Sequence, residues 1–392
     1  MSTFIYIIAL IIVSYLTISG AYQFMLALAS KRKSKGICHF DGRKRKLLVL
    51  VPAYKEDQVI LHSTKRNMDL KYKYPKTHFD YVVISDGLKP ETNNELKALG
   101  AHVLPVSFEK STKVKSLQVA IKHYDNNYDG VIVLDADNVA DMNILFKASH
   151  YLSCGFRAIQ GLRTAANMQT SVALMDGLSE TANTEMLCKG ANRLGFSSKL
   201  SGSGMVFDYE LFKSLVFDLK AIGGFDKELE LALTNTKEYI HYAEDIIVFD
   251  EKVSDTEAFA KQRGRWLQAQ YTFFYASLAS ALDGLRDGKL DYFHKVMQLA
   301  LPPRALSPIA LTVLSLSSFA LGADQLVMLS ITGLTLTIGS YFLVLPLKIL
   351  LKYGLQIVGS LPSITMAAIK SLTFMKESKK TFLHTQHELT GS

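Results

Sequence analysis

Long apolar runs occur near both ends of the chain, and a region of shorter runs lies between them. Residues 4–29 contain no charged side chain over 26 positions. About 20 apolar residues cross the hydrocarbon core of a bilayer as a helix. Residues 306–323 and 326–347 are two further runs, separated by a short turn. The pattern predicts an N-terminal transmembrane anchor over residues 1–29 and a transmembrane hairpin over residues 305–348.

Residues 353–369 form another apolar run, which is short and contains Gly354, Gly359 and Pro362. A further crossing here would carry the lysine-rich tail to the other side of the membrane. We therefore expect an interfacial helix and a basic cytosolic tail over residues 349–392. Apolar residues at helical spacing between 274 and 285 predict interfacial amphipathic helices over residues 271–304. Their apolar face is expected either in the protein core or on the bilayer.

Basic residues are concentrated directly after the first apolar run. Residues 31–46 include eight lysines and arginines and one acid, Asp41, so this stretch carries +7 of the net charge of +8. The segment 30–46 is therefore predicted to be a cytosolic juxtamembrane cluster, with the N-terminus outside the plasma membrane. A cleaved signal peptide is the alternative, but its basic residues would precede the apolar run. The rest of the chain is nearly neutral, which argues against nucleic acid as a partner.

The central region, residues 47–270, alternates short apolar runs with helical patterns and contains no linker, which predicts one domain. The runs lie at residues 47–51, 81–84, 103–106 and 131–134. Between the last two, Val114, Leu117, Ile121 and Tyr124 recur on one face of a helix. Continuous apolar strands separated by helices indicate a parallel sheet that is covered on both sides.

Polar residues follow these strands at the point where each one ends. Ligands of such sheets bind beyond the carboxyl ends of the strands. Asp135 and Asp137 follow the fourth run at positions i and i+2, so both carboxylates point to one side of an extended chain. Paired carboxylates suit Mg²⁺ or Mn²⁺ shared with a phosphate, although a polar strand end with two acids is the alternative reading.

Two lysines, Lys113 and Lys115, enter the helix before the fourth run near its N-terminus, where phosphate binding is favoured. A solvated surface charge is the alternative for each lysine, and it is the favoured one for Lys115. Acids for a metal and cations for phosphates together predict a nucleotide site at this rim.

Three motifs follow further along the chain. Residues 201–204 read Ser-Gly-Ser-Gly, a turn where backbone can approach a ligand closely, and residues 223–226 read Gly-Gly-Phe-Asp. Residues 262–266 read Gln-Arg-Gly-Arg-Trp. Arg265 offers a planar fork suited to a diphosphate, and Trp266, the only tryptophan, favours a stacking role.

In this order the motifs resemble those of the membrane-embedded, inverting family-2 glycosyltransferases, the group that includes cellulose, chitin and hyaluronan synthases. The matching motifs are VPAYKE at 51–56, SDG at 85–87, TKVKSLQ at 112–118, DAD at 135–137, GSG at 202–204, GGFD at 223–226 and QRGRW at 262–266. The resemblance implies an α/β fold, a GT-A-like, Rossmann-type mixed sheet flanked by helices. It also fits one N-terminal and about two C-terminal transmembrane helices plus interfacial helices.

The resemblance also implies roles for individual residues. The uracil and ribose of a UDP-sugar would be held by Ala53, Tyr54, Glu56 and Asp86. Lys113 would approach the diphosphate, and Asp137, with Asp135 nearby, would bind Mg²⁺ or Mn²⁺. The residues expected to close over the diphosphate and shape the acceptor end are Gln262, Arg265, Trp266, Gly202, Ser203 and Gly204.

The general base that the resemblance implies is Asp226. Family members usually carry a Glu-Asp pair there, and the obvious pair in this chain is Glu244-Asp245. That pair lies only 17 residues before Gln262, whereas the family places the base about twice as far upstream. Asp226 lies 36 residues before Gln262, and Phe225 replaces the usual Glu. A helix N-cap is the alternative role for Asp226.

The resulting hypothesis is an inverting transfer from a UDP-sugar to a glycan or lipid-linked acceptor at the cytosolic membrane face, either processively or by single additions. The alternative from another class is a non-catalytic sugar-nucleotide-binding membrane scaffold or sensor.

Overall fold

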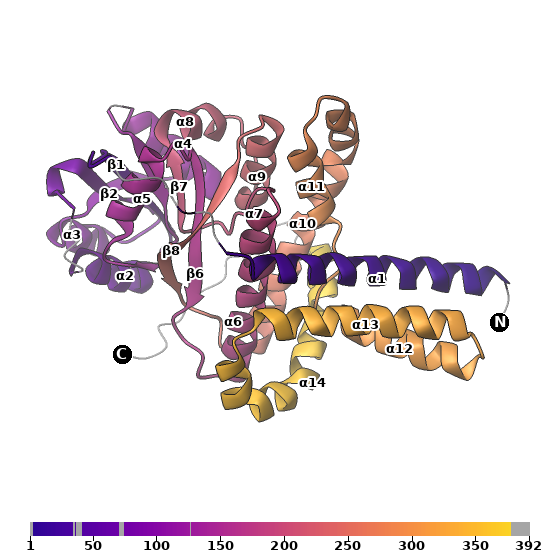
Figure 1. Ribbon diagram of the computed structural model, residues 1–392. Coiled ribbons are helices and arrows are strands. Elements are labelled where there is room, and N and C mark those ends of the chain that lie inside the picture. Colours follow the sequence, from indigo (N-terminus) through magenta and orange to yellow (C-terminus); the bar gives the residue numbers. More distant parts are fainter. Residues whose placement is uncertain (1–2, 34–35, 37–40, 70–73, 126, 378–392) are drawn as a thin grey trace.

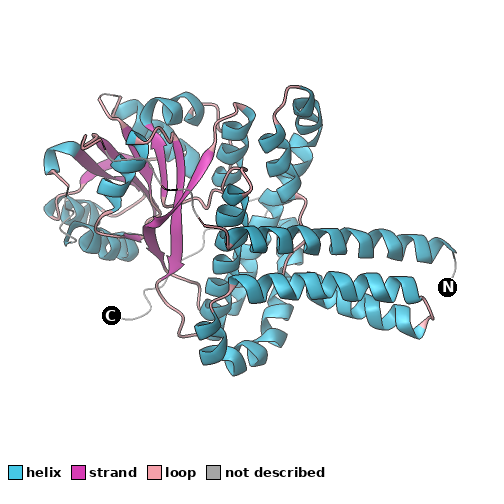
Figure 2. Ribbon diagram, viewed as in Figure 1, coloured by secondary structure: helices cyan, strands magenta, loops and turns pink. Residues whose placement is uncertain are grey.

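The computed structural model describes residues 3–33, 36, 41–69, 74–125 and 127–377, so Lys35, Lys379 and Lys380 of the predicted basic segments lie outside the described residues. Its centre is a mixed sheet with the strand order β3-β2-β1-β4-β7-β6-β8-β5 (Figure 2). The strands are β1 (Leu47–Tyr54), β2 (Phe79–Asp86), β3 (His102–Val106), β4 (Gly130–Val133), β5 (Val139–Ala140), β6 (Ala158–Ala165), β7 (Met205–Asp208) and β8 (Ile240–Asp250).

Strand pairing brings the predicted polar strand ends to one rim. β1 pairs in parallel with β2 and β4, and β2 pairs in parallel with β3. Tyr54 lies opposite Asp86 in this register. β7 is antiparallel to β4 and β6, and β5 is antiparallel to β8. The four predicted strands and the mixed α/β sheet are therefore confirmed.

Both faces of the sheet are covered, which explains the continuous apolar runs. Leu47, Val49 and Val51 of β1 point into one core, and Leu48 and Leu50 point into the other. The first core is closed by α2 (Asp57–Asp69), α3 (Pro90–Ala98) and α5 (Ile144–Ser153). The second is closed by α4 (Lys113–His123), α8 (Tyr209–Val216) and α9 (Phe225–Asn235). A 3₁₀ turn, η1 (Lys76–His78), precedes β2.

A layer of helices lies between the sheet and the apolar segments (Figure 1). It comprises α6 (Ser171–Asn183), the π-helical turns η2 (Thr184–Gly190), α7 (Ala191–Arg193), α10 (Thr256–Arg286), α11 (Leu290–Leu299) and α14 (Leu347–Glu377). α1 (Thr3–Ser30) meets this layer at Gly190, because a Cβ there would stand 2.3 Å from the Leu26 carbonyl oxygen. The anchor helix is therefore packed directly against the helix that leads to the sheet.

Among the described residues, three helices are long and apolar enough to cross a membrane: α1, α13 (Asp324–Val344) and residues 347–375 of α14. α12 (Ser307–Ala320) has only 14 residues, so the run predicted as a span at 306–323 yields a helix shorter than a full crossing. In Figure 1, α1, α12 and α13 lie side by side.

α14 differs from the short, interrupted helix expected at 353–369, because it continues for 31 residues through Pro362. Packing of one face against α10 and α6 supports it, with Ala367 fully buried among Phe259 and Ala260. Leu351, Leu355 and Val358 are exposed on another face. In Figure 1, α14 runs across the direction of α1 and α13. Its interfacial placement stays a prediction.

Candidate active site

One cavity of about 2670 Å³ runs from the rim of the sheet to the apolar helices. It is lined by the ends of β1, β2 and β4, by α4, α6, α9 and α10, and by parts of α12, α13 and α14. All the residues predicted for the site line this cavity except Ser203 and Gly204. The folded chain thus brings together side chains that are more than 200 residues apart in sequence, from Ala53 to Trp266.

Tight backbone geometry forms the end of the cavity that is predicted to bind the nucleoside. Ala53 and Asp86 are buried, while Tyr54 and Glu56 are partly exposed at the same rim. The Lys55 N–H donates to the Asp86 carbonyl at 3.1 Å, which ties the end of β1 to the end of β2. Lys55 has a φ of 53°, a backbone conformation that residues other than glycine rarely adopt. Such local strain is typical of functional sites.

Asp137 is a buried carboxylate next to other acids. The Asn138 amide donates to Asp137 at 3.0 Å and to Asp250 at 3.1 Å. Burial, followed by the charges of Asp250 and Asp135, raises the pKa of Asp137 well above its ordinary value. A divalent cation would offset this concentration of negative charge, so the donor chemistry fits Mg²⁺ or Mn²⁺.

In the part of the chain that the structure describes, no three His, Cys, Asp or Glu side chains form a complete metal site. Mg²⁺ often binds through one or two carboxylates and takes its other ligands from water and substrate phosphates. The carboxylates of Asp135 and Asp137 match that pattern. Asp250, at the end of β8, escaped the sequence prediction, and its only signal was an acid following a strand.

Lys113 already has partners at the site. Its ammonium group binds the Asp135 carboxylate and donates to the Gly202 carbonyl at 2.7 Å. It therefore bridges Asp135 and the glycine turn. Lys115 is exposed and donates to the Lys110 carbonyl at 2.8 Å, in line with the surface role favoured for it.

Ser203 and Gly204 support the site from behind and do not line the cavity, contrary to the expected contact with diphosphate or acceptor. The Ser203 hydroxyl is buried, accepts the Asp135 N–H at 3.1 Å and binds the Asn138 side chain. Gly204 has φ +63°, and a Cβ there would lie 3.2 Å from the Val248 side chain. Only Gly202 of the three faces the cavity.

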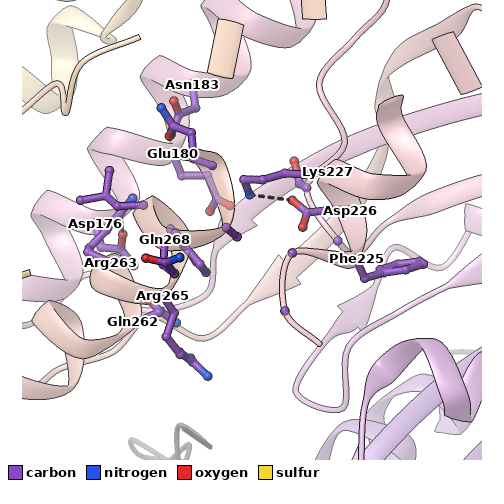
Figure 3. A pocket seen from close by; sticks show the side chains of 18 of the residues that line it. Asp176, Glu180, Asn183, Phe225, Asp226, Lys227, Gln262, Arg263, Arg265 and Gln268 are labelled. Carbon is purple, nitrogen blue, oxygen red and sulfur yellow. Dashed lines mark hydrogen bonds and ion pairs between the residues drawn. The ribbon is translucent and has the colours of Figure 1, made fainter. Parts of the chain in front are cut away.

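Asp226 lies in the first turn of α9 and points toward Lys227, which it meets at 3.4 Å (Figure 3). Gly224, with φ +77°, occupies the N-cap position, so the capping role considered for Asp226 is not the one that the structure shows. Burial acts to raise the pKa of Asp226, but Lys227, Lys199 and Lys113 outweigh it and leave that pKa lowered. The carboxylate is therefore ionised at neutral pH.

The rejected pair, Glu244-Asp245, lies elsewhere and does not line the cavity. Glu244 pairs with Lys189 at 2.7 Å and Arg193 at 3.0 Å, and Asp245 accepts from the Tyr151 hydroxyl at 2.6 Å. These partners give both acids a structural role.

The Gln-Arg-Gly-Arg-Trp motif lies within α10, and its two arginines do different things. Arg263 pairs with Asp176 of α6 and stacks on Trp266, with 4.5 Å between its guanidinium carbon and the ring centroid. Arg265 extends away from Asp176 in Figure 3, and burial lowers its pKa. The Gln262 Oε1 atom is buried and accepts no hydrogen bond within the described chain. The motif therefore contributes the Arg265 side chain and the Gln262 hydrogen-bond acceptor to the lining of the cavity.

α6 supplies a cavity wall that the sequence prediction missed. Asp176, Glu180 and Asn183 recur at spacings of four and three residues and face Asp226 and Lys227 across the cavity in Figure 3. That polar stripe at helical spacing was the available signal. Glu180 pairs with Arg163 at 3.1 Å and also with Lys252. Buried salt bridges of this kind fix the position of the wall relative to β6 and β8.

The chain is similar to known proteins in sequence and in structure. The family model described as "Glycosyltransferase like family 2" matches residues 44–269. No curated protein sequence matches the chain. Among solved structures, it is similar to the mannosyltransferase PcManGT from Pyrobaculum calidifontis, in complex with GDP-Man and Mn²⁺. That similarity has 14% identity, covers 95% of this chain and 96% of the other, and has a TM-score of 0.57, which shows a shared fold.

A second similar structure is glucosyl-3-phosphoglycerate synthase from Mycobacterium tuberculosis in complex with Mn²⁺, UDP and phosphoglyceric acid. It has 16% identity, covers 54% of this chain and 72% of the other, and has a TM-score of 0.38.

Proposed function

The chain belongs to glycosyltransferase-like family 2, and on that basis we propose that it is a metal-dependent, inverting glycosyltransferase. It would transfer a sugar from a UDP-sugar to a glycan or lipid-linked acceptor at the cytosolic face of the plasma membrane. The observation that carries the proposal is the single cavity, which holds the acid pair Asp135/Asp137, the ionised Asp226 and Arg265 together.

The donor would lie across the rim of the sheet. Ala53, Tyr54, Glu56 and Asp86 would hold the nucleoside, and Lys113 and Arg265 would hold the diphosphate. Uracil is the proposed base. Because PcManGT was solved with GDP-Man, a guanine donor is the comparison that a donor panel must include.

Asp137 and Asp135 would hold the divalent cation. When bound, the cation would stabilise the negative charge on the departing diphosphate. Arg265, which lines the same cavity, would share this task, because its guanidinium suits a diphosphate.

Asp226 would act as the general base. The acceptor oxygen attacks the anomeric carbon as its proton passes to the Asp226 carboxylate. The bond from that carbon to the diphosphate oxygen breaks, and the nucleoside diphosphate leaves with the electron pair. Attack opposite the leaving group inverts the anomeric configuration, and the ionised state of Asp226 supports this role.

The membrane arrangement supports an enzyme that acts at the bilayer surface. α1 and the α12–α13 hairpin would cross the bilayer, the basic cluster after α1 would lie in the cytosol, and the N-terminus would lie outside. The same cavity could retain a growing polymer or release each product after one addition, and product length separates the two.

The test is nucleoside diphosphate release from purified protein with a panel of UDP-sugars and GDP-Man, with Mg²⁺ or Mn²⁺. We expect release with one UDP-sugar and a dependence on the cation. If the protein binds a nucleotide-sugar but releases no nucleoside diphosphate with any acceptor added, the result would contradict the proposal and favour the sensor or scaffold.

A further inference from the structure

The cavity continues past Asp226 into the apolar helices. Its far end is lined by Ile309 and Val313 of α12, Leu334 and Ile338 of α13, and Leu361 and Ile364 of α14. α12 and α13 form the apolar hairpin, so this end of the cavity enters the part of the molecule assigned to the bilayer. An acceptor made only of sugar would have no apolar chain to bury against this lining.

Arg304 also lines the cavity, and in the chain it lies between Pro302-Pro303 and the start of the apolar helix α12. Its Nη1 atom is buried and has no hydrogen-bond partner, and no carboxylate of the described chain pairs with it. Burial lowers the pKa of Arg304, and the ionisable groups that act on it are Tyr341, Arg263, Tyr22 and Cys188, none of which is a carboxylate.

Three other buried or partly buried cations of the cavity have carboxylate partners. Arg163 and Lys252 both pair with Asp250, and Arg263 pairs with Asp176. A buried charge without a counter-ion is costly, and an arginine fork matches a phosphate particularly well. The described chain supplies no counter-ion for Arg304, so an anion of a bound ligand would fit there.

Arg304 and Asp226 line the same cavity, and neither is among the charged groups that act on the other. Cys188 is within electrostatic range of both Arg304 and Lys199, and Lys199 is within range of Asp226. The cations that act on Asp226 are Lys227, Lys199 and Lys113. The same cavity is lined by Gln262, whose buried Oε1 atom accepts no hydrogen bond within the described chain. The cavity, with a volume of about 2670 Å³, is large enough to hold a sugar unit together with the donor.

We propose that the acceptor is a lipid-linked sugar whose phosphate linkage binds Arg304. Its sugar hydroxyl reaches Asp226, and its apolar chain lies against α12, α13 and α14. This inference rests on the proposed function and adds the acceptor class to it. In the transfer, the sugar hydroxyl oxygen bonds to the anomeric carbon, its proton goes to Asp226, and the acceptor phosphate is unchanged.

The test compares three acceptors that carry the same sugar. The first has an alkyl chain joined through a phosphate, the second has the same chain without the phosphate, and the third has the phosphate without the chain. With wild-type protein and a working donor, the KM of the first should be the lowest. Losing a charged hydrogen bond costs about 10–100-fold in affinity, so the neutral alkyl glycoside should have a KM higher by about that factor.

Arg304→Gln should raise the KM of the phosphate-linked acceptor toward that of the neutral one and change the neutral one far less. Arg286→Gln, on the exposed end of α10, is the matched control and should leave the ratio of the two KM values unchanged. A ratio unaffected by Arg304→Gln would overturn the assignment of the phosphate to Arg304.

The wild-type comparison needs no variant, so it holds even if Arg304→Gln fails to fold. Equal use of the neutral alkyl glycoside would overturn the phosphate site. Equal use of the sugar phosphate without a chain would overturn the lipid, and identify a free phosphate ester as the acceptor. If wild-type protein releases no nucleoside diphosphate from any donor, even to water, the proposed function itself fails.

Discussion

Asp226 is buried beside three lysines, whose charges outweigh the effect of burial, lower its pKa and keep it in the ionised form that a general base requires. General-base catalysis contributes about 10²–10⁴-fold, so Asp226→Asn should lower kcat by that range. Donor binding should change little, because the proposed role of the carboxylate is to contact the acceptor and not the donor. Nucleoside diphosphate release and calorimetric donor binding measure the two effects. Asp283→Asn, on an exposed part of α10, is the control, and turnover retained by Asp226→Asn would rule out the base assignment.

A bound cation would stabilise the Asp137 carboxylate, because this side chain is buried beside Asp250 and Asp135. Asp137→Asn should weaken nucleotide binding in Mn²⁺ by at least about 10–100-fold, by analogy with losses at metal-supporting residues. Without metal, the wild-type protein and the Asp137→Asn variant should both bind the nucleotide weakly. Titrations with Mn²⁺ and with a chelator measure the difference, and equal metal dependence in the variant would exclude this ligand.

Lys199 makes the stability depend on pH. Burial lowers its pKa to about 8 in the folded protein, from an ordinary value of 10.5. Between these values the unfolded chain binds more protons, so stability rises with pH across this window. Lys199→Met should flatten the rise in Tm from pH 8 to 10.5 by a few degrees. Thermal unfolding in detergent measures it, and parallel wild-type and variant curves would refute it.

The junction of α9 and α10 positions Asp226 at the level of whole elements. A Cβ on Gly224 would stand 2.7 Å from the Ala269 Cβ, and Gly224 has φ +77°. Gly224→Ala should destabilise the protein by about 1–3 kcal/mol, the cost of strained backbone for a non-glycine residue. Gly223→Ala is the matched control, because its Cβ meets nothing within 4 Å. Equal Tm values for the two variants would show that the junction is not tight.

Elements with a local signal could be predicted from the sequence. The apolar runs of β1, β2 and β4 and the apolar face of α4 are set by alternation and helical spacing, and all are found. β7 could not be placed, because pairing antiparallel to β4 and β6 depends on contacts distant in sequence. The length of α14 also escaped prediction, since packing against α10 carries the helix through Pro362.

The site residues were likewise predictable only where the sequence carries a local motif. Motif residues such as Asp137, Asp226 and Arg265 could be named because their spacing matches a family pattern. Lys199, Asp250 and Arg304 could not, because the value of a charge at a site depends on its burial and on whether a counter-ion lies nearby. Both are properties of the folded chain.

At the scale of the whole molecule, α1 and the α12–α13 hairpin form one unit. The Tyr6 hydroxyl donates to Gln325 at 2.9 Å, so the start of α1 lies beside the turn of the hairpin. Both should face the outside. An epitope tag after Gly322 should be accessible in intact cells, and a tag after Gly288, between α10 and α11, only after permeabilisation. Reversed accessibility would overturn the orientation.

The measurement that tests the central claim most directly is the anomeric configuration of the first-formed product, determined by NMR during transfer from the working nucleotide-sugar. With Asp226 opposite the leaving group in a single cavity, the new glycosidic bond should have the configuration opposite to that of the donor. A product that retains the donor configuration would contradict the assignment of Asp226 and the one-step transfer built on it.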